Sequence, residues 1–252
     1  MKNIKYIFPN ALTLINLLLG CVAITVVFKA QNEYNAAWLI IFAAIADLLD
    51  GMVARLLNAK SAFGAQLDSL ADMVSFGVAP ALIIFNWFNL ILIEMSTGSN
   101  FDLTSAGFPQ NIVLLCSLFF AAAAGLRLAK FNTTPQSDHT FKGLTTTAAG
   151  LIIASLWLLI NTENEFVRSI ILNIYFALFL LAVLIMLMLS NIPMLSLKFH
   201  GISLKNNFDR YIIIVISSLL ILFFRVEGIF FSLAFYVLFS LLINFLRKRE
   251  TA

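Results

Sequence analysis

Residues 47–72 read DLLDGMVARLLNAKSAFGAQLDSLAD, an apolar stretch interrupted by acidic side chains. The aspartates in it are Asp47, Asp50, Asp68 and Asp72. A charged side chain in the middle of a membrane helix costs about 2.5–3.5 kcal/mol or more. So many acidic groups in one short apolar segment are therefore expected to carry a function.

The four aspartates occupy two helical faces, because residues three or four positions apart share one side of a helix. The first face holds Asp47, Asp50, Gly51 and Ala54, and the second holds Gly64, Asp68 and Asp72. The connection at 58–61 is short and polar, which makes the two helices antiparallel neighbours. We expect both faces to converge on one pocket near the membrane surface.

Carboxylates this close together repel one another unless a cation neutralises them. Hard divalent ions such as Mg²⁺, Mn²⁺ or Ca²⁺ prefer oxygen ligands, and no His or Cys lies nearby to favour zinc. The small residues Gly51, Ala54 and Gly64 permit two interpretations. They let helices pack closely, or they leave room for a bulky polar ligand beside the metal, which the carboxylates one turn away favour.

The composition indicates a membrane protein. Hydrophobic residues make up 61% of the 252 residues and charged residues 12%, against about 25% charged in a soluble domain. The mean hydropathy is +0.97. The basic residues form no extended stripe, so nothing indicates nucleic-acid binding. Cys21 and Cys116 lie in apolar runs without the spacing of a disulfide or metal site.

The apolar runs predict an all-α integral membrane protein with about eight transmembrane helices. The predicted spans are 10–28, 36–56, 64–92, 110–130, 144–160, 167–190, 210–225 and 228–246. Only Arg225 to Gly228 separates the last two, which predicts a tight helical hairpin. Lys2 and Lys5 precede the first apolar run as in a signal peptide, but no clear cleavage pattern follows, so we interpret that run as a membrane helix.

Eight spans place both termini on one side, and the positive-inside rule assigns that side to the cytoplasm. With this orientation 13 of the 16 basic residues lie inside. They are Lys2, Lys5, Arg55, Lys60, Arg127, Lys130, Lys142, Lys198, Lys205, Arg210, Arg247, Lys248 and Arg249. The outside set is Lys29, Arg168 and Arg225. The longest polar stretch, about 191–209, is too short to bury a soluble core.

The pattern D-x2-D-G-x2-A-R-x8-G-x3-D-x3-D resembles the signature of the CDP-alcohol phosphatidyltransferase family. Its fixed identities here are Asp47, Asp50, Gly51, Ala54, Arg55, Gly64, Asp68 and Asp72. The resemblance implies a six-helix catalytic core, usually dimeric, within residues 1–190. It implies that the first three aspartates bind a pair of divalent ions and that Asp72 acts as the general base. A connection at 191–209 and a helical hairpin with a basic tail at 210–252 would be additions.

Three further stretches resemble the phosphatidylserine synthase branch of that family. They are PNALTLINLLLG at 9–20, LDSLADMVSFGVAPA at 67–81, and RLAKFN at 127–132 followed by FKGLTTTAAG at 141–150. Together with the motif they cover residues 9–150 discontinuously. Thr145 and Thr147 depart from the branch, where proline is expected, which leaves the local backbone open.

The residues in these stretches also have a physical interpretation, and alternatives stay open for each. Asn10, Thr13 and Asn16 recur every three residues, so they could bond cytidine or phosphate, or simply start a helix and bond its neighbour. Arg127 and Lys130 close the fourth helix, where basic residues anchor at headgroups or, in this branch, hold phosphate or the serine carboxylate. Ser75 could contact the acceptor alcohol or pack between helices.

The resemblance implies a reaction between CDP-diacylglycerol and L-serine that releases CMP. One alternative is another acceptor, such as glycerol 3-phosphate or inositol phosphate, which would need an additional basic pocket for its phosphate. A second is a cation transporter that uses the carboxylates for permeation. A transporter need not carry Arg55 beside its acidic cluster.

Overall fold

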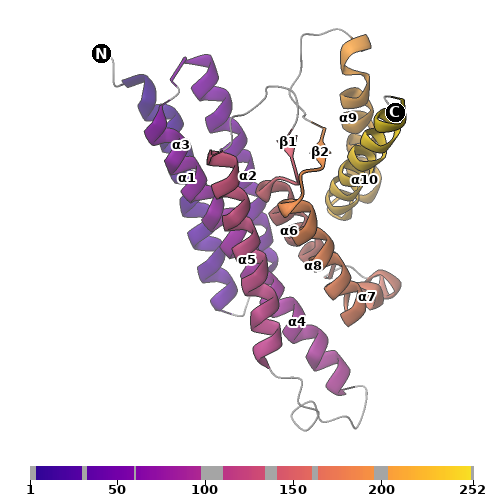
Figure 1. The fold of residues 1–252 in the computed structure, drawn as a ribbon. Helices are drawn as coiled ribbons and strands as arrows, with labels where there is room; N and C mark the ends of the chain where they lie inside the picture. Colours follow the sequence, from indigo (N-terminus) through magenta and orange to yellow (C-terminus); the bar gives the residue numbers. More distant parts are fainter. Residues whose placement is uncertain are drawn as a thin grey trace.

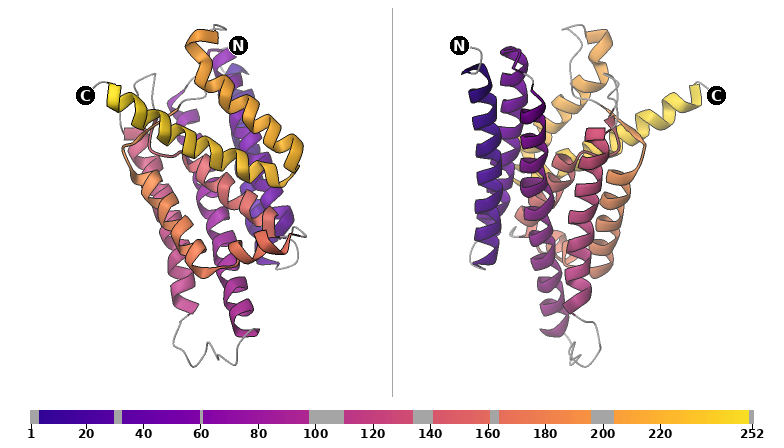
Figure 2. Two further views of the ribbon diagram at one scale, coloured as in Figure 1. Left: turned by 90° about the vertical axis from the view of Figure 1, so that its right-hand side faces the viewer. Right: turned by 60° about the vertical axis from the view of Figure 1, so that its left-hand side comes forward.

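A computed structural model describes residues 4–29, 33–59, 61–97, 110–133, 141–160, 164–195 and 204–250. The elements before the middle of the chain are α1 (Ile4–Phe28), α2 (Glu33–Leu56), α3 (Ala62–Asp72), the π-helix η1 (Met73–Val78), α4 (Ala79–Thr97) and α5 (Gln110–Thr133). Those that follow are β1 (Phe141–Lys142), α6 (Thr146–Ile160), α7 (Glu165–Ile171), α8 (Ile174–Leu189), β2 (Pro193–Met194), α9 (Leu204–Phe224) and α10 (Glu227–Glu250). The fold is a bundle of long helices, with α9 and α10 laid obliquely across one side (Figures 1 and 2).

Most of these helices suit a bilayer. Among the described residues, six are long and apolar enough to cross a membrane, and the bent pair α7–α8 would make a seventh. The chain is therefore an all-α membrane protein in architecture, as its composition predicts. The eight-span count stays a prediction, because the run predicted at 144–160 forms α6, which has only 15 residues.

Helix α6 forms the centre of the bundle. It packs against α2, α4, α10 and η1, and nearly all of its side chains are buried. Its start is capped by Thr145, whose Oγ1 accepts a hydrogen bond from Ala148 N at 3.1 Å. Ser and Thr side chains are favoured at this position because they satisfy a free N–H of the first turn. The threonine that replaces an expected proline thus starts the helix by capping it.

The third span contains a π-helical turn directly after Asp72. Ala79 N donates to Val74 O, five residues back, where an α-helix would bond four back. Pro80 follows and has no N–H to offer Phe76 O, which favours the wider turn. Other helices approach η1 closely: a Cβ at Gly20 would lie 2.4 Å from Ser75 Oγ, and one at Gly150 would lie 2.9 Å from Phe76 O. The sequence analysis did not anticipate this turn.

Two other features differ from the predicted spans. The run predicted at 167–190 is two helices, α7 and α8, bent by 63°. The break follows from Asn173, whose side chain caps α8 by accepting from Tyr175 N and Phe176 N. The connection predicted at 191–209 contains β2, which pairs with β1 in antiparallel register, Phe141 opposite Met194. The tight hairpin between α9 and α10 is confirmed, with Arg225 and Val226 between the helices.

Candidate functional site

A short turn between α2 and α3 brings the acidic faces together. Helix α2 ends at Leu56, and Asn58 in the turn that follows adopts a left-handed conformation with φ 48°. Ala59 N bonds Ala54 O at 2.8 Å and Asn58 N bonds Arg55 O at 3.2 Å, a C-terminal cap that satisfies the last carbonyls. Ser61 then caps α3 by accepting from Gly64 N at 3.0 Å. The chain therefore reverses at once, and α3 begins beside the end of α2.

Three of the aspartates form one cluster. Carboxylate oxygens of Asp47 and Asp50 on α2 and of Asp68 on α3 all lie within 4.8 Å of one another. Asp72, one turn beyond Asp68, is within electrostatic reach of all three. The convergence expected from the helical spacing is confirmed.

Helix α1 contributes polar groups to both ends of the cluster. Thr13 Oγ1 donates to Asp50 Oδ2 at 2.5 Å and lies 3.0 Å from the carbonyl oxygen of Pro9. Asn16 Nδ2 donates to Asp72 Oδ1 at 3.3 Å. Thr13 and Asn16 are both buried, at 4% and 0% exposure, so these bonds fix the two carboxylates from the side of α1.

The cluster borders a cavity of about 220 Å³, which we call the acidic cavity. Its lining residues are Pro9, Asn10, Thr13, Asp50, Gly51, Ala54, Ala59, Ser61, Gly64, Ala65 and Asp68. A Cβ at Gly51 would meet nothing closer than Arg55 Nη2 at 4.0 Å, so the space beside Asp50 is open. A Cβ at Gly64 would lie 3.2 Å from Asn10 Oδ1, so Gly64 permits close approach of α1. Gly51 therefore fits the interpretation that small residues leave room for a ligand, and Gly64 fits the interpretation that they let helices pack closely.

The donor set fits a hard divalent cation. All three clustered side chains offer carboxylate oxygens, the ligands that such ions prefer. Asp68 Oδ1 and Asn16 Oδ1 are buried acceptors without a hydrogen-bond partner among the described residues. Buried acceptors normally find a donor or a cation, so these oxygens fit a positively charged ligand.

Several predicted site residues lie outside the acidic cavity. Arg55 is exposed, and its Nε donates to Gly51 O on its own helix at 2.8 Å. Ser75 is fully buried and donates to Asn16 O at 2.9 Å, so its contact with an acceptor alcohol stays a prediction. Arg127 and Lys130 lie at the end of α5, where Arg127 is within electrostatic reach of Asp72. Lys60, in the predicted cytoplasmic set, lies outside the described residues.

The sequence analysis missed part of the cavity lining. Pro9, Ala59, Ser61 and Ala65 were not singled out as site residues. One signal was available: Ser61 stands three residues before Gly64, the spacing of an N-terminal cap. The other residues are small or apolar, and only the packing of α1 on the α2–α3 turn brings them to the cavity.

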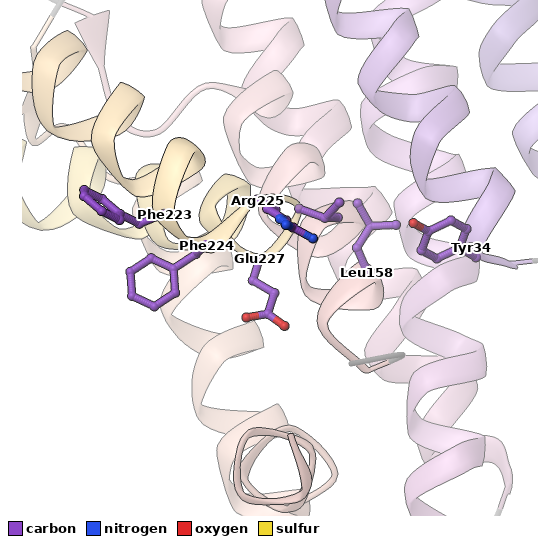
Figure 3. Close-up of a pocket in the computed structure, with 7 residues that line it drawn as sticks. Tyr34, Leu158, Phe223, Phe224, Arg225 and Glu227 are labelled. Carbon is purple, nitrogen blue, oxygen red and sulfur yellow. The ribbon is translucent and has the colours of Figure 1, made fainter. Parts of the chain in front are cut away.

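A second cavity lies at the other end of α2. It measures about 410 Å³ and is lined by Tyr34, Leu158, Phe223, Phe224, Arg225, Val226 and Glu227; we call it the hairpin cavity. Figure 3 shows Tyr34 facing the α9–α10 turn across Leu158. Tyr34 and Asp50 are about 24 Å apart along the helix axis at 1.5 Å per residue. The hairpin cavity is therefore separate from the acidic cluster.

Several known proteins of one name are similar to this chain in sequence. A CDP-diacylglycerol–serine O-phosphatidyltransferase of Helicobacter pylori is 30% identical over 242 residues, 95% of this chain and 92% of that protein. A protein of the same name from Mycobacterium tuberculosis is 32% identical over 218 residues, 84% of this chain and 68% of that protein. Another from Bacillus subtilis is 32% identical over 148 residues, 59% of this chain and 73% of that protein.

The family model of CDP-alcohol phosphatidyltransferases matches residues 6–188, which run from α1 to α8 and contain all four aspartates. This chain belongs to the CDP-alcohol phosphatidyltransferase family.

Proposed function

We propose that the protein transfers the phosphatidyl group of CDP-diacylglycerol to the hydroxyl of L-serine and releases CMP, as a CDP-diacylglycerol–serine O-phosphatidyltransferase. The observation that carries this proposal is the acidic cavity, where three clustered carboxylates border open space at Gly51. The names of the relatives in three bacteria support serine as the acceptor. The stretches at 9–20, 67–81 and 127–150 support the same branch.

Asp47, Asp50 and Asp68 are proposed to hold the divalent metal, Mg²⁺ or Mn²⁺, with Ca²⁺ a further candidate and two ions the expected number. Such an ion supplies positive charge for the diphosphate oxygens and for the charge that develops on the leaving CMP. The hydrogen bond from Thr13 keeps one Asp50 oxygen oriented. Asp72 is available as a further ligand, since it lies within electrostatic reach of the other three.

The cytidine diphosphate is proposed to enter the acidic cavity. Gly51, Ala54 and Gly64 supply space, and Asn10 and Thr13 supply polar groups from α1. Asn16 lies deeper on the same helix, fully buried, and is proposed to contribute through its bond to Asp72. Arg55 is proposed to bind the diphosphate at the cavity edge, which its exposed side chain one turn beyond Gly51 supports. The acyl chains of the donor lipid would remain in the bilayer against the apolar surface of the bundle.

Asp72 is the proposed general base. Asn16 holds its Oδ1, which orients the carboxylate toward the acidic cluster. The serine hydroxyl attacks the phosphorus that bears diacylglycerol, a new oxygen–phosphorus bond forms, and the bond to CMP breaks. CMP departs with the electron pair, and the hydroxyl proton passes to Asp72. Arg127 and Lys130 are proposed to hold phosphate or the serine carboxylate, and Ser75 to border the acceptor.

The proposed setting is the cytoplasmic membrane, with eight spans, both termini inside and the acidic cavity open to the cytoplasm. The basic residues at the cavity end of the bundle support this orientation through the positive-inside rule. Residues 1–190 would form the catalytic core, 191–209 the connection and 210–252 the hairpin and tail. A homodimer is proposed from the family resemblance.

The test uses purified protein with CDP-diacylglycerol, Mg²⁺ or Mn²⁺, and one candidate alcohol at a time. We expect CMP release with L-serine and formation of phosphatidylserine. CMP release with glycerol 3-phosphate or inositol phosphate, and none with serine, would replace the acceptor and keep the family. No CMP with any alcohol would refute the enzymatic proposal for this chain.

A further inference from the structure

The basic residues at the end of α5 are held by two segments, one just before α6 and one just after α8. Arg127 is 6% exposed, and its Nε donates to Leu144 O at 2.9 Å. Lys130 Nζ donates to Asn191 Oδ1 at 2.6 Å. Each residue therefore takes its orientation partly from a partner that lies far from it in the sequence.

These partners belong to one small structure, in which residues 143–144 pack on residues 187–195. Leu144 N donates to Leu187 O at 3.0 Å, and Gly143 N donates to Ile192 O at 2.8 Å. Gly143 has φ 78°, and a Cβ there would lie 2.7 Å from Ser190 O, so only glycine fits. We call residues 190–195 the anchoring segment.

Two side chains of helix α10 donate hydrogen bonds to the backbone of the anchoring segment. The Tyr236 hydroxyl donates to Leu195 O at 2.9 Å, and the Asn244 side-chain amide donates to Pro193 O. Tyr236 and Asn244 are eight residues apart, so they lie on nearly the same face of the helix. In Figure 1, β1 and β2 lie between α10 and the ends of α6 and α8.

A continuous path therefore joins α10 to the acidic site. It runs from Tyr236 and Asn244 to the anchoring segment, then to the Leu144 carbonyl, and then to Arg127. The guanidinium of Arg127 is in turn within electrostatic reach of Asp72 and of Tyr236. Helix α10 lies beyond residues 6–188, which the family model covers.

We propose that Tyr236 and Asn244 are positioning residues. They hold the anchoring segment so that the Leu144 carbonyl orients Arg127 toward Asp72 and Asn191 orients Lys130 at the end of α5. This inference rests on the proposed function, because it assigns Arg127 and Lys130 to substrate. In this proposal α10 affects the reaction without contacting the substrate, by orienting residues of α5.

The alternative is that these bonds only add stability. Helix α10 also packs through apolar side chains, with Val237 buried and Phe230, Leu233 and Leu241 against the core. That packing survives removal of a hydroxyl, so the loss of one bond should disturb the anchoring segment more than the fold. The two interpretations therefore differ in which measurement changes.

The variants are Tyr236→Phe and Asn244→Ala in the full-length protein. Ser232→Ala is the matched control, because Ser232 is also on α10 and its hydroxyl, within the described part of the chain, bonds Ile229 O of its own helix at 2.8 Å and not the anchoring segment. KM for serine, KM for CDP-diacylglycerol, kcat and the melting temperature in detergent are measured for each. We expect Tyr236→Phe to raise one of the two KM values by roughly three- to tenfold, with little change in melting temperature. Ser232→Ala should leave both KM values within about twofold of the wild type.

The variant Arg127→Lys shows which of the two KM values depends on Arg127. It should raise the same KM that Tyr236→Phe raises, because a lysine cannot present the same Nε–H to Leu144 O. In the double variant the Tyr236 effect should largely vanish, since residues that act through one another are not additive. Additive effects, different KM values, or a lowered melting temperature with unchanged kinetics would each overturn the proposal.

The wild-type enzyme separates this inference from the proposed function. If the wild type releases CMP with an alcohol other than serine, the same comparison is made with that alcohol, and the positioning role stands or falls on its own. If Tyr236→Phe leaves every kinetic constant within twofold of the wild type while serine transfer is intact, only the positioning role is lost.

Discussion

The two cavities at opposite ends of α2 differ in size and in chemistry. The hairpin cavity is the larger, about 410 Å³ against about 220 Å³. Its lining has one acidic and one basic residue, Glu227 and Arg225, among aromatic and apolar side chains. The acidic cavity has Asp50 and Asp68, with Asp47 in the same cluster, and a hydroxyl bonded to Asp50. Converging carboxylates beside open space, rather than volume, therefore distinguish the proposed catalytic site.

The largest expected effect comes from breaking the cluster itself. Asp68→Asn removes a carboxylate charge while preserving its shape, so metal binding should fail. We expect a loss of turnover of about a thousandfold or more, since Lewis-acid stabilisation is worth several kcal/mol. Mn²⁺ titration and CMP release measure the two effects. Glu165→Gln, which changes an exposed acid at the start of α7, is the control and should leave both unchanged.

Asp72→Asn tests the division of labour within the acidic site. An amide can still accept the bond from Asn16 but cannot take the proton of the acceptor alcohol. Turnover should fall by about a hundredfold to a thousandfold, the range of general-base catalysis. Binding of Mn²⁺ and of CDP-diacylglycerol should be retained. Turnover close to that of the wild type would remove Asp72 from the role of base.

Thr13→Val removes the hydroxyl that orients Asp50 and keeps the shape of the side chain. Groups that hydrogen-bond a metal ligand commonly change metal affinity by about 10–100-fold, so we expect a loss of about tenfold in Mn²⁺ affinity. Thr25→Val is the matched control on the same helix, since among the described residues the Thr25 hydroxyl bonds Val22 O of its own helix and no acidic side chain. Equal effects of the two variants would mean that the loss is general to α1.

Gly51→Leu fills the open side of the acidic cavity. Leucine favours a helix more than glycine does by roughly 0.5–1 kcal/mol, and a Cβ at this position would meet only the end of the flexible Arg55 side chain, at 4.0 Å, so we expect no fall in the melting temperature. KM for CDP-diacylglycerol should nevertheless rise, by roughly fivefold on the scale of one blocked contact. Gly20→Ala should instead lower the melting temperature, because its Cβ would lie 2.4 Å from Ser75 Oγ. An unchanged KM for Gly51→Leu would place the diphosphate elsewhere.

The smallest effect is expected at the hairpin cavity. Arg225→Gly suits the left-handed backbone there, φ 52°, and removes the only basic side chain of that lining. All kinetic constants should stay within about twofold of the wild type, a difference below about 0.4 kcal/mol. A tenfold loss of turnover would contradict the separation of the two cavities.

Much of the acidic site was predictable because its information is local. Helical spacing alone placed Asp47, Asp50 and Asp68 on facing sides, and the short polar turn made the helices neighbours. The membrane helices were predictable for the same reason, since hydropathy is a property of a continuous run. The break at Asn173 was missed because an asparagine in an apolar run leaves the mean hydropathy high while capping a new helix.

Contacts between distant residues were not predictable in this way. The bonds of Thr13 to Asp50 and of Ser75 to the backbone of Asn16 span 37 and 59 residues. Arg127 looked like a headgroup anchor or a substrate ligand, and its buried bond to Leu144 O had no local signal. The π-turn after Asp72 and the β1–β2 pair likewise depend on what packs around them.

The sequence by itself determined the membrane class of the protein and the acidic motif, and it predicted a divalent cation as the ligand, because hydropathy, helical period and carboxylate chemistry belong to short segments. Only the tertiary structure decided how α1 fixes Asp50 and Asp72, and how α10 reaches Arg127 through the anchoring segment. The physical reason is that a hydrogen bond between distant segments exists only once the packing of the whole bundle has brought donor and acceptor within about 3 Å.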